Sequence, residues 1–211
     1  MTDSNYSHIL AIVDRSGSMS LGGVDKEMTN ALNLYFAEQA KLDGKCLVDY
    51  VQFDTEYEQV YGDRPVSEAK AVIEPRGGTA LVDAIGRGTV ELGKKLKDLP
   101  EAHRPGKVQV VVVTDGGENS SREFTAEKVR NLVTKQTDKY DWDYVFLGAN
   151  IDAVATGTAY GFAAGKSMTF DTQNTGQTVA SLNAYTTAYR GAAGAAAAFS
   201  EDDRKNAVKK N

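Results

Sequence analysis

Three oxygen-bearing side chains alternate near the start of the chain: Asp14, Ser16 and Ser18, directly after the apolar run 9–13. Because this run is short, aliphatic and stopped by turn residues, it predicts a buried strand with the three side chains at its carboxyl end. Open α/β sheets place their binding sites at that end. Three converging oxygens suit a hard divalent cation. The same pattern also fits a turn whose Asp and Ser side chains cap the next helix.

Two later positions could add oxygen ligands to this stretch. Thr79 follows the glycine turn 75–78 and opens a segment with helical periodicity, where it could equally serve at or near the helix N-cap. Asp115 ends the valine-rich run 108–113, which is typical of a strand covered on both faces. The combined set is more specific than any of its pieces and predicts one metal site. Its members are Asp14, Ser16, Ser18, Thr79 and Asp115.

The segments that must position these residues alternate between strand and helix patterns. Helical patterns begin near 24, 79, 125, 150 and 177, and further strand patterns begin near 45, 56, 107, 142 and 168. This alternation predicts a doubly wound α/β fold, with a mainly parallel six-stranded sheet and helices on both faces. The polar segment 56–61 is expected to close one edge as an antiparallel strand. A short helix is expected after Asn150, which would cap it.

The domain organisation is expected to be simple, because no repeat or long linker interrupts the sequence. We expect one domain over 1–199, followed by a tail over 200–211. Ser200 precedes three acidic residues, a pattern typical of a helix N-terminus, so the tail could form a short helix. The last long helix, 177–190, could continue into the alanine-rich stretch 192–198.

Composition favours a soluble globular protein with protein partners. The chain has 211 residues, 41% of them hydrophobic and 25% charged, and a net charge of -5. This acidic balance, with scattered Lys and Arg, opposes binding to nucleic acid. The amino-terminal sequence has no apolar segment of signal or membrane-span length, so we expect a cytoplasmic protein that does not bind a membrane. Cys46 is the one cysteine, and its apolar neighbours predict a buried thiol.

The five predicted ligands resemble the metal-ion-dependent adhesion site (MIDAS) of the von Willebrand factor A (vWA) family. That site is written Asp-x-Ser-x-Ser, then Thr, then Asp, and every position matches here. The likeness covers roughly 7–190 and is closest to small stand-alone members from bacteria and phages. It implies a Rossmann-like sheet of order 3-2-1-4-5-6. It also implies that Ser16 and Ser18 bind the metal directly, while Thr79, Asp14 and Asp115 act directly or through water.

The function implied by the resemblance is metal-dependent protein recognition. Hydroxyl groups are neutral ligands, so Mg2+ held by them, or Mn2+ or Ca2+ in its place, keeps much of its charge. It would then attract an Asp or Glu of a partner protein. The alternative is a scaffold or regulatory subunit of a larger assembly, for example with an ATPase. Glu118 and Asn119 follow Asp115 and either edge the binding surface or are solvated loop residues.

An enzymatic role, magnesium-dependent phosphoryl transfer, is the less favoured alternative. Phosphatases of the haloacid-dehalogenase type use Asp-x-Asp, whose second carboxylate is the general acid and base. Here Ser16 holds that place, and a hydroxyl has no suitable pKa. Neither His8 nor His103 lies near a plausible nucleophile in the sequence, so both are predicted to be structural or surface residues. We therefore expect a binding protein rather than an enzyme.

Overall fold

The computed structural model describes residues 1–191 and 197–209 and is built on a six-stranded sheet of order β3-β2-β1-β4-β5-β6. The antiparallel pair is β2 with β3, and the other neighbouring strands are parallel. The predicted strand order and antiparallel edge are therefore confirmed. The strands are β1 (Asp3–Asp14), β2 (Lys45–Phe53), β3 (Tyr57–Pro65), β4 (Pro105–Thr114), β5 (Asp143–Ala149) and β6 (Ser167–Phe170).

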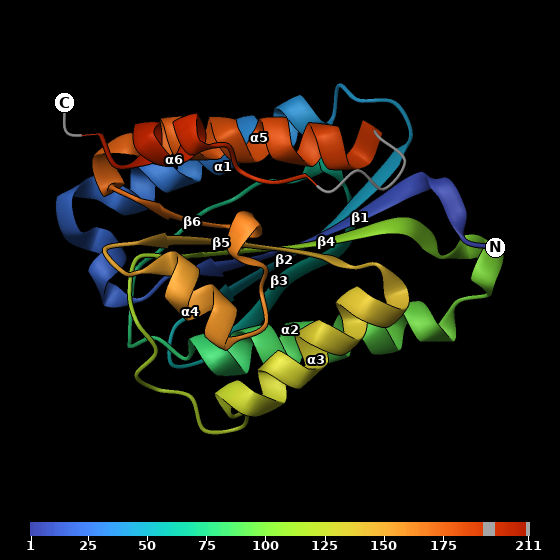
Figure 1. The fold of residues 1–211 in the computed structure, drawn as a ribbon, viewed down its shortest axis with the longest axis horizontal. Helices are drawn as coiled ribbons and strands as arrows, with labels where there is room; N and C mark the ends of the chain where they lie inside the picture. Colours follow the sequence, from blue (N-terminus) through green and yellow to red (C-terminus); the bar gives the residue numbers. More distant parts are fainter. Residues whose placement is uncertain (192–196, 210–211) are drawn as a thin grey trace.

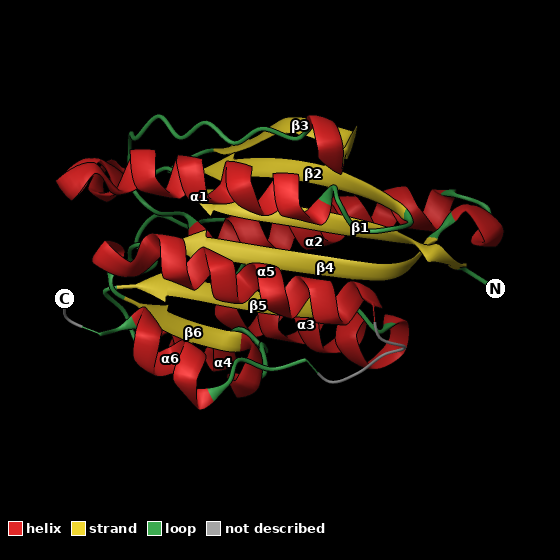
Figure 2. Cartoon of the chain, turned by 90° about the horizontal axis from the view of Figure 1, so that it is seen from above, coloured by secondary structure: helices red, strands yellow, loops and turns green. Residues whose placement is uncertain are grey.

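Helices cover both faces of this sheet, as Figure 1 shows. The helices α1 (Val24–Gln39), α5 (Thr175–Gly191) and α6 (Glu201–Ala207) lie on one face. The other face carries α2 (Leu81–Asp98), α3 (Ala126–Tyr140) and α4 (Ala153–Ala159). Seen from above, α1 and α5 lie side by side over the sheet and run roughly along the direction of its strands (Figure 2). Covering both faces explains why the central strands read as continuous apolar runs.

Strand β1 lies near the middle of the sheet, between β2 and β4. Alternate side chains of β1 enter two separate hydrophobic cores: Ile9 and Val13 pack with α1 and α5, while Leu10 and Ile12 pack with α2 and α3. The chain leaves β1 toward the α1 face and leaves β4 toward the α3 face. Neighbouring strands whose connections diverge in this way leave a crevice at their carboxyl ends. Asp14 and Asp115 lie at that crevice.

The helix boundaries differ from the sequence expectations in one place, the start of α4, whereas Thr79 lies next to the N-cap of α2 as expected. Helix α2 begins at Leu81, and Ala80 holds its N-cap position without a side-chain cap, so Thr79 lies just outside the helix. Helix α4 is capped by Asp152, whose side chain accepts a hydrogen bond from the Ala155 amide, and not by Asn150. Asn150 instead adopts a left-handed backbone conformation with φ of 58°. In the described part of the chain no helix is both long and apolar enough to span a bilayer.

The carboxyl-terminal region forms a short helix that packs against β6 and α5. Helix α6 begins with a reciprocal capping box between Ser200 and Asp203, and the Ser181 hydroxyl donates to Asp203 at 2.7 Å. The Ala207 carbonyl then accepts a hydrogen bond from the Asp171 amide just after β6. The short helix expected after residue 200 is therefore present and packed against the domain. The expected helical extension over 192–198 falls mostly on 192–196, which lie outside the described residues.

The thiol of Cys46 lies in β2 and is buried in the core under α1. Burial raises its pKa to about 11. The thiol therefore stays protonated and unreactive at neutral pH. The prediction of a buried cysteine is confirmed.

Candidate metal centre

The carboxylate of Asp14 anchors the first group of predicted ligands. It is fully buried at the end of β1. Its Oδ1 accepts the Ser16 amide at 2.6 Å, and its Oδ2 accepts the Thr114 hydroxyl at 2.5 Å. The hydroxyl oxygens of Ser16 and Ser18 lie 3.0 Å apart, and the Ser18 hydroxyl donates to Asp115 Oδ1 at 2.8 Å. Loops 14–18 and 114–116 are thus joined through these oxygens.

Thr79 reaches the same place from the glycine turn. Gly116 has no side chain, and a Cβ built there would lie 3.8 Å from Ser18 Oγ and 3.9 Å from Thr79 Oγ1. Both hydroxyls therefore lie close to one point. The backbone of Thr79 is held by Asn119. The side-chain Oδ1 of Asn119 accepts the Thr79 amide at 2.8 Å, and its backbone N–H donates to the Thr79 carbonyl at 3.0 Å. The structure brings all five predicted residues together at one end of the sheet.

The two carboxylates of this group are perturbed by burial. Burial raises the pKa of Asp14 to about 6; hydrogen bonds from Thr114 and Ser16 oppose the shift, and the charge of Asp115 adds to it. Burial also raises the pKa of Asp115, against the Ser18 hydrogen bond. Among the described residues neither carboxylate pairs with a Lys or Arg side chain. Two acidic groups are therefore buried together with only hydroxyl and amide donors.

The other buried aspartates of the described chain each have a cationic partner. Asp49 pairs with Lys95 at 2.6 Å, and Asp143 pairs with Lys166 at 2.6 Å. Asp54 pairs with Arg15 at 2.7 Å. Because a buried charge without a partner is costly, the Asp14 and Asp115 pair stands apart electrostatically. Its donor set is carboxylate and hydroxyl oxygen, which fits a hard divalent cation such as Mg2+, Mn2+ or Ca2+.

Glu118 and Asn119 lie in the loop after β4, where Glu118 is half-buried and Asn119 is exposed, and both form hydrogen bonds with the segment 79–82. Glu118 Oε2 accepts the Val82 amide at 2.9 Å, and its Oε1 accepts the amides of Ser120 and Ser121 at 2.8 and 2.7 Å. Its carboxylate thus meets the amino-terminal turn of α2, where negative charge is favourable. Together with the Asn119 contacts to Thr79, it ties the loop after β4 to the start of α2.

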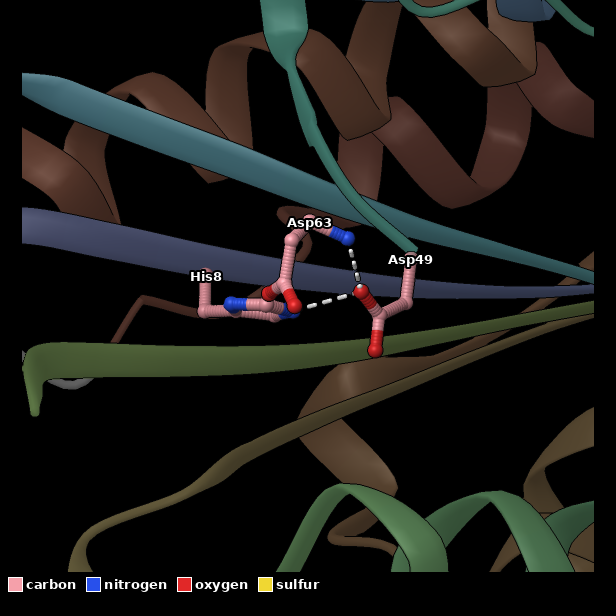
Figure 3. Close-up of side chains that lie close together, drawn as sticks. All are labelled: His8, Asp49 and Asp63. Atoms are coloured by element: carbon pink, nitrogen blue, oxygen red, sulfur yellow. Dashed lines mark hydrogen bonds and ion pairs between the residues drawn. The ribbon is translucent and has the colours of Figure 1, made fainter. Parts of the chain in front are cut away.

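A second group of possible metal ligands lies elsewhere in the sheet. His8, Asp49 and Asp63 offer ligand atoms that lie within 4.8 Å of one another (Figure 3). Asp49 Oδ1 lies 3.2 Å from His8 Nε2 and accepts the Asp63 amide at 2.8 Å. The Lys95 ammonium bonds both Asp49 oxygens, at 2.8 and 2.6 Å, and Asp63 Oδ1 at 2.9 Å.

This second group already contains its own cation. Burial alone would raise the pKa of Asp49, but the contacts with His8 and Lys95 outweigh it and lower that pKa to about 2. The group is therefore a compensated ion network, in contrast to the Asp14 and Asp115 pair. His8 is fully buried in it, so of the two expectations for this histidine, a structural or a surface residue, the surface one is wrong. The sequence does not reveal the network, because its members are far apart along the chain.

No family model matches this sequence, and no curated protein matches it either. Solved structures do match the fold. VWA2, the ArnB paralog of Sulfolobus acidocaldarius, has a TM-score of 0.53 and 15% identity, covering 84% of this chain and 44% of that chain. A von Willebrand factor type A protein of Catenulispora acidiphila has a TM-score of 0.57 and 17% identity, covering 85% and 42%.

A third match is proximal thread matrix protein 1 (PTMP1) of the mussel byssus, in a structure whose MIDAS motif holds zinc. Its TM-score is 0.55 at 15% identity, covering 78% of this chain and 41% of that chain. This chain thus spans less than half the length of the three matched chains. At such identities the likeness concerns the fold. Sheet order, helix placement and these matches together show that the chain has the fold of a von Willebrand factor A domain.

Proposed function

We propose that this chain binds a divalent cation at the Asp14 end of the sheet and through it an Asp or Glu side chain of a partner protein. The ligands would be Asp14, Ser16, Ser18, Thr79 and Asp115. Mg2+ is the expected cation, with Mn2+ and Ca2+ as alternatives. One observation carries the proposal: two buried carboxylates share a cluster of hydroxyl groups without a cationic side chain, while the other buried aspartates of the described chain are paired.

The chemistry of the donor set supports recognition of a carboxylate. Neutral hydroxyls leave a bound cation with much of its charge, so it would supply an open position for an acidic side chain. Access to that position is favoured by Gly117, where a Cβ would meet no atom within 4 Å. The vWA fold commonly serves protein recognition, and the zinc-bound MIDAS of PTMP1 is an example of metal binding on this fold. Carrying both properties over to this chain is the proposal.

The test replaces one ligand and measures cation binding directly. Asp115→Asn removes a charge with little change in shape, and we expect it to weaken Mn2+ binding, followed by electron paramagnetic resonance, at least tenfold. Glu27→Gln is the matched control, since it removes one exposed charge from α1. Capture of partners from a host lysate should be lost with EDTA and with Asp115→Asn, but not with Glu27→Gln. Equal Mn2+ binding by Asp115→Asn and the wild type would refute the proposed site.

A further inference from the structure

Arg15 lies between two of the proposed ligands, yet its side chain serves a different part of the structure. The side chain is only 7% exposed. Its Nε donates to Asp54 Oδ2 at 2.7 Å, and its Nη1 donates to Glu58 Oε2 at 2.6 Å and to Gln52 Oε1 at 3.3 Å. A buried guanidinium is tolerated only when it is well paired. These contacts fasten the first ligand loop to the β2–β3 hairpin.

The backbone around Arg15 makes further connections. The Arg15 amide donates to the Phe53 carbonyl at 2.8 Å, and the Arg15 carbonyl accepts the Arg76 amide at 2.7 Å. Two residues later the Gly17 amide donates to the Gly77 carbonyl at 3.1 Å. The loop that carries Asp14, Ser16 and Ser18 is therefore bonded both to the end of β2 and to the glycine turn.

Asp54 completes the connection from the other side. Its Oδ2 accepts Arg76 Nε at 2.8 Å in addition to Arg15 Nε, and its side chain is only 2% exposed. Its backbone carbonyl accepts the Ala80 amide at 2.7 Å. The turn that carries Thr79 is thus held by Asp54 on both sides of that residue, at Arg76 and at Ala80.

The glycine turn packs directly on this aspartate. Gly77 has a φ of +66°, and a Cβ there would lie 3.3 Å from the Asp54 side chain and 3.1 Å from Thr55 Oγ1. A turn in such close contact cannot move toward the β2–β3 hairpin, and its hydrogen bonds oppose movement away from it. The Arg15 and Asp54 side-chain pair thus adds a link between the turn that carries Thr79 and the first ligand loop, beside the backbone bonds that join them directly.

We propose that Arg15 and Asp54 are positioning residues of the metal centre: their ion pair fixes the loop carrying Thr79 against the loop carrying Asp14, Ser16 and Ser18. This inference rests on the proposed function, because it concerns the affinity of that same site. Hydroxyl ligands are weak individually, so a cation bound by three of them depends on how well they are arranged before it binds. Substitution of residues that support the ligands of a metal site commonly lowers the metal affinity 10–100-fold, so we expect about a tenfold effect here.

The experiment compares Asp54→Asn and Arg15→Lys with the wild type. Each variant is expected to raise the Mn2+ dissociation constant about tenfold. The double variant should show no further loss, because either substitution alone already breaks the same ion pair. A readout without metal is hydrogen exchange in EDTA: the amides of Arg76 and Ala80, which donate to the Arg15 and Asp54 carbonyls, should exchange at least tenfold faster in Asp54→Asn. If Asp54→Asn does not fold, Arg76→Ala, at a half-exposed side chain, tests the same connection and should weaken binding several-fold.

Asp49→Asn is the matched control, because it breaks a different buried aspartate–cation pair, on β2, without touching the ligand loops. Its Mn2+ dissociation constant and its exchange at Arg76 and Ala80 should stay within twofold of the wild type. Unchanged affinity in Asp54→Asn, or an equal loss in Asp49→Asn, would overturn the positioning role. Wild-type protein that binds no Mn2+ would overturn the metal site and this dependence together, whereas normal wild-type binding with unaffected variants would overturn the positioning role alone.

Discussion

Asp14→Asn should make the metal-free protein more stable at neutral pH while it abolishes metal binding. The carboxylate is fully buried, and its pKa is raised from 3.8 to about 6, chiefly by burial. A raised pKa in the folded state means that the ionised group opposes folding. The protonated carboxyl does not oppose folding, so the folded protein has its full stability below about pH 4, near the pKa of Asp14 in the unfolded chain. Part of that stability is lost as the pH rises through 6, the pKa of Asp14 in the folded protein.

The size of the effect follows from the pKa difference. The shift from 3.8 to about 6 spans about two units, and at about 1.4 kcal/mol per unit the ionised carboxylate costs about 3 kcal/mol above pH 7. About half of that cost develops between pH 5 and pH 8. Asparagine keeps an acceptor for the Ser16 amide and can donate to the Thr114 hydroxyl, which has the Gly116 carbonyl 3.0 Å away as its own acceptor. We expect a net gain of about 1–3 kcal/mol at pH 8.

Urea unfolding in EDTA at pH 5 and pH 8 measures this effect. The free energy of unfolding of the wild type should fall between the two pH values, and that of Asp14→Asn should change less. Excess MgCl2 at pH 8 should then stabilise the wild type alone, because a ligand that binds only the folded state raises its stability. An Asp14→Asn protein that is less stable than the wild type in EDTA at pH 8, or that Mg2+ stabilises equally, would refute the reasoning.

Two further predictions concern acid stability and the glycine turn. The pKa of Asp49 is lowered to about 2, so the stability it provides, about 2 kcal/mol, is present above pH 4 and lost as the pH falls through 2. In acid unfolding followed by circular dichroism, the stability of Asp49→Asn should fall less steeply with decreasing pH than that of the wild type. Identical profiles would contradict the prediction. Gly77→Ala should cost about 1–2 kcal/mol of unfolding free energy, because φ is +66°. Gly117→Ala, with open space around its Cβ, should be silent in the same urea assay.

The fold could be predicted from hydrophobic patterns because the central strands are covered on both faces. The apolar runs in β1 and β4 are long enough to mark parallel strands, and the polar pattern near Tyr57 marks the exposed edge. Helix starts were harder to place. Asn150 and Asp152 are both good N-cap residues, and the choice between them depends on the backbone conformation that the neighbouring strand imposes.

The grouping of the five predicted ligands followed from the convergence of strand ends, which is a property of the topology. The residues that support them could not be predicted in the same way. Arg15 reads as an arbitrary residue between two ligands, and its partner Asp54 lies 39 positions away. Patterns of burial identify which faces are apolar, but they do not specify which charged side chains meet. The same holds for Glu118, whose carboxylate oxygens accept hydrogen bonds from amides of α2 and of its own loop.

The isolation of Cys46 in the core makes the chain convenient for spectroscopy. Its buried, protonated thiol should not react with maleimide reagents at neutral pH, so a cysteine introduced at an exposed position could be labelled selectively. Gly117 is such a position, because it is exposed, lies beside Gly116 and has room for a side chain. A fluorophore attached to Gly117→Cys would report the arrival of a cation or a partner without removal of the native thiol.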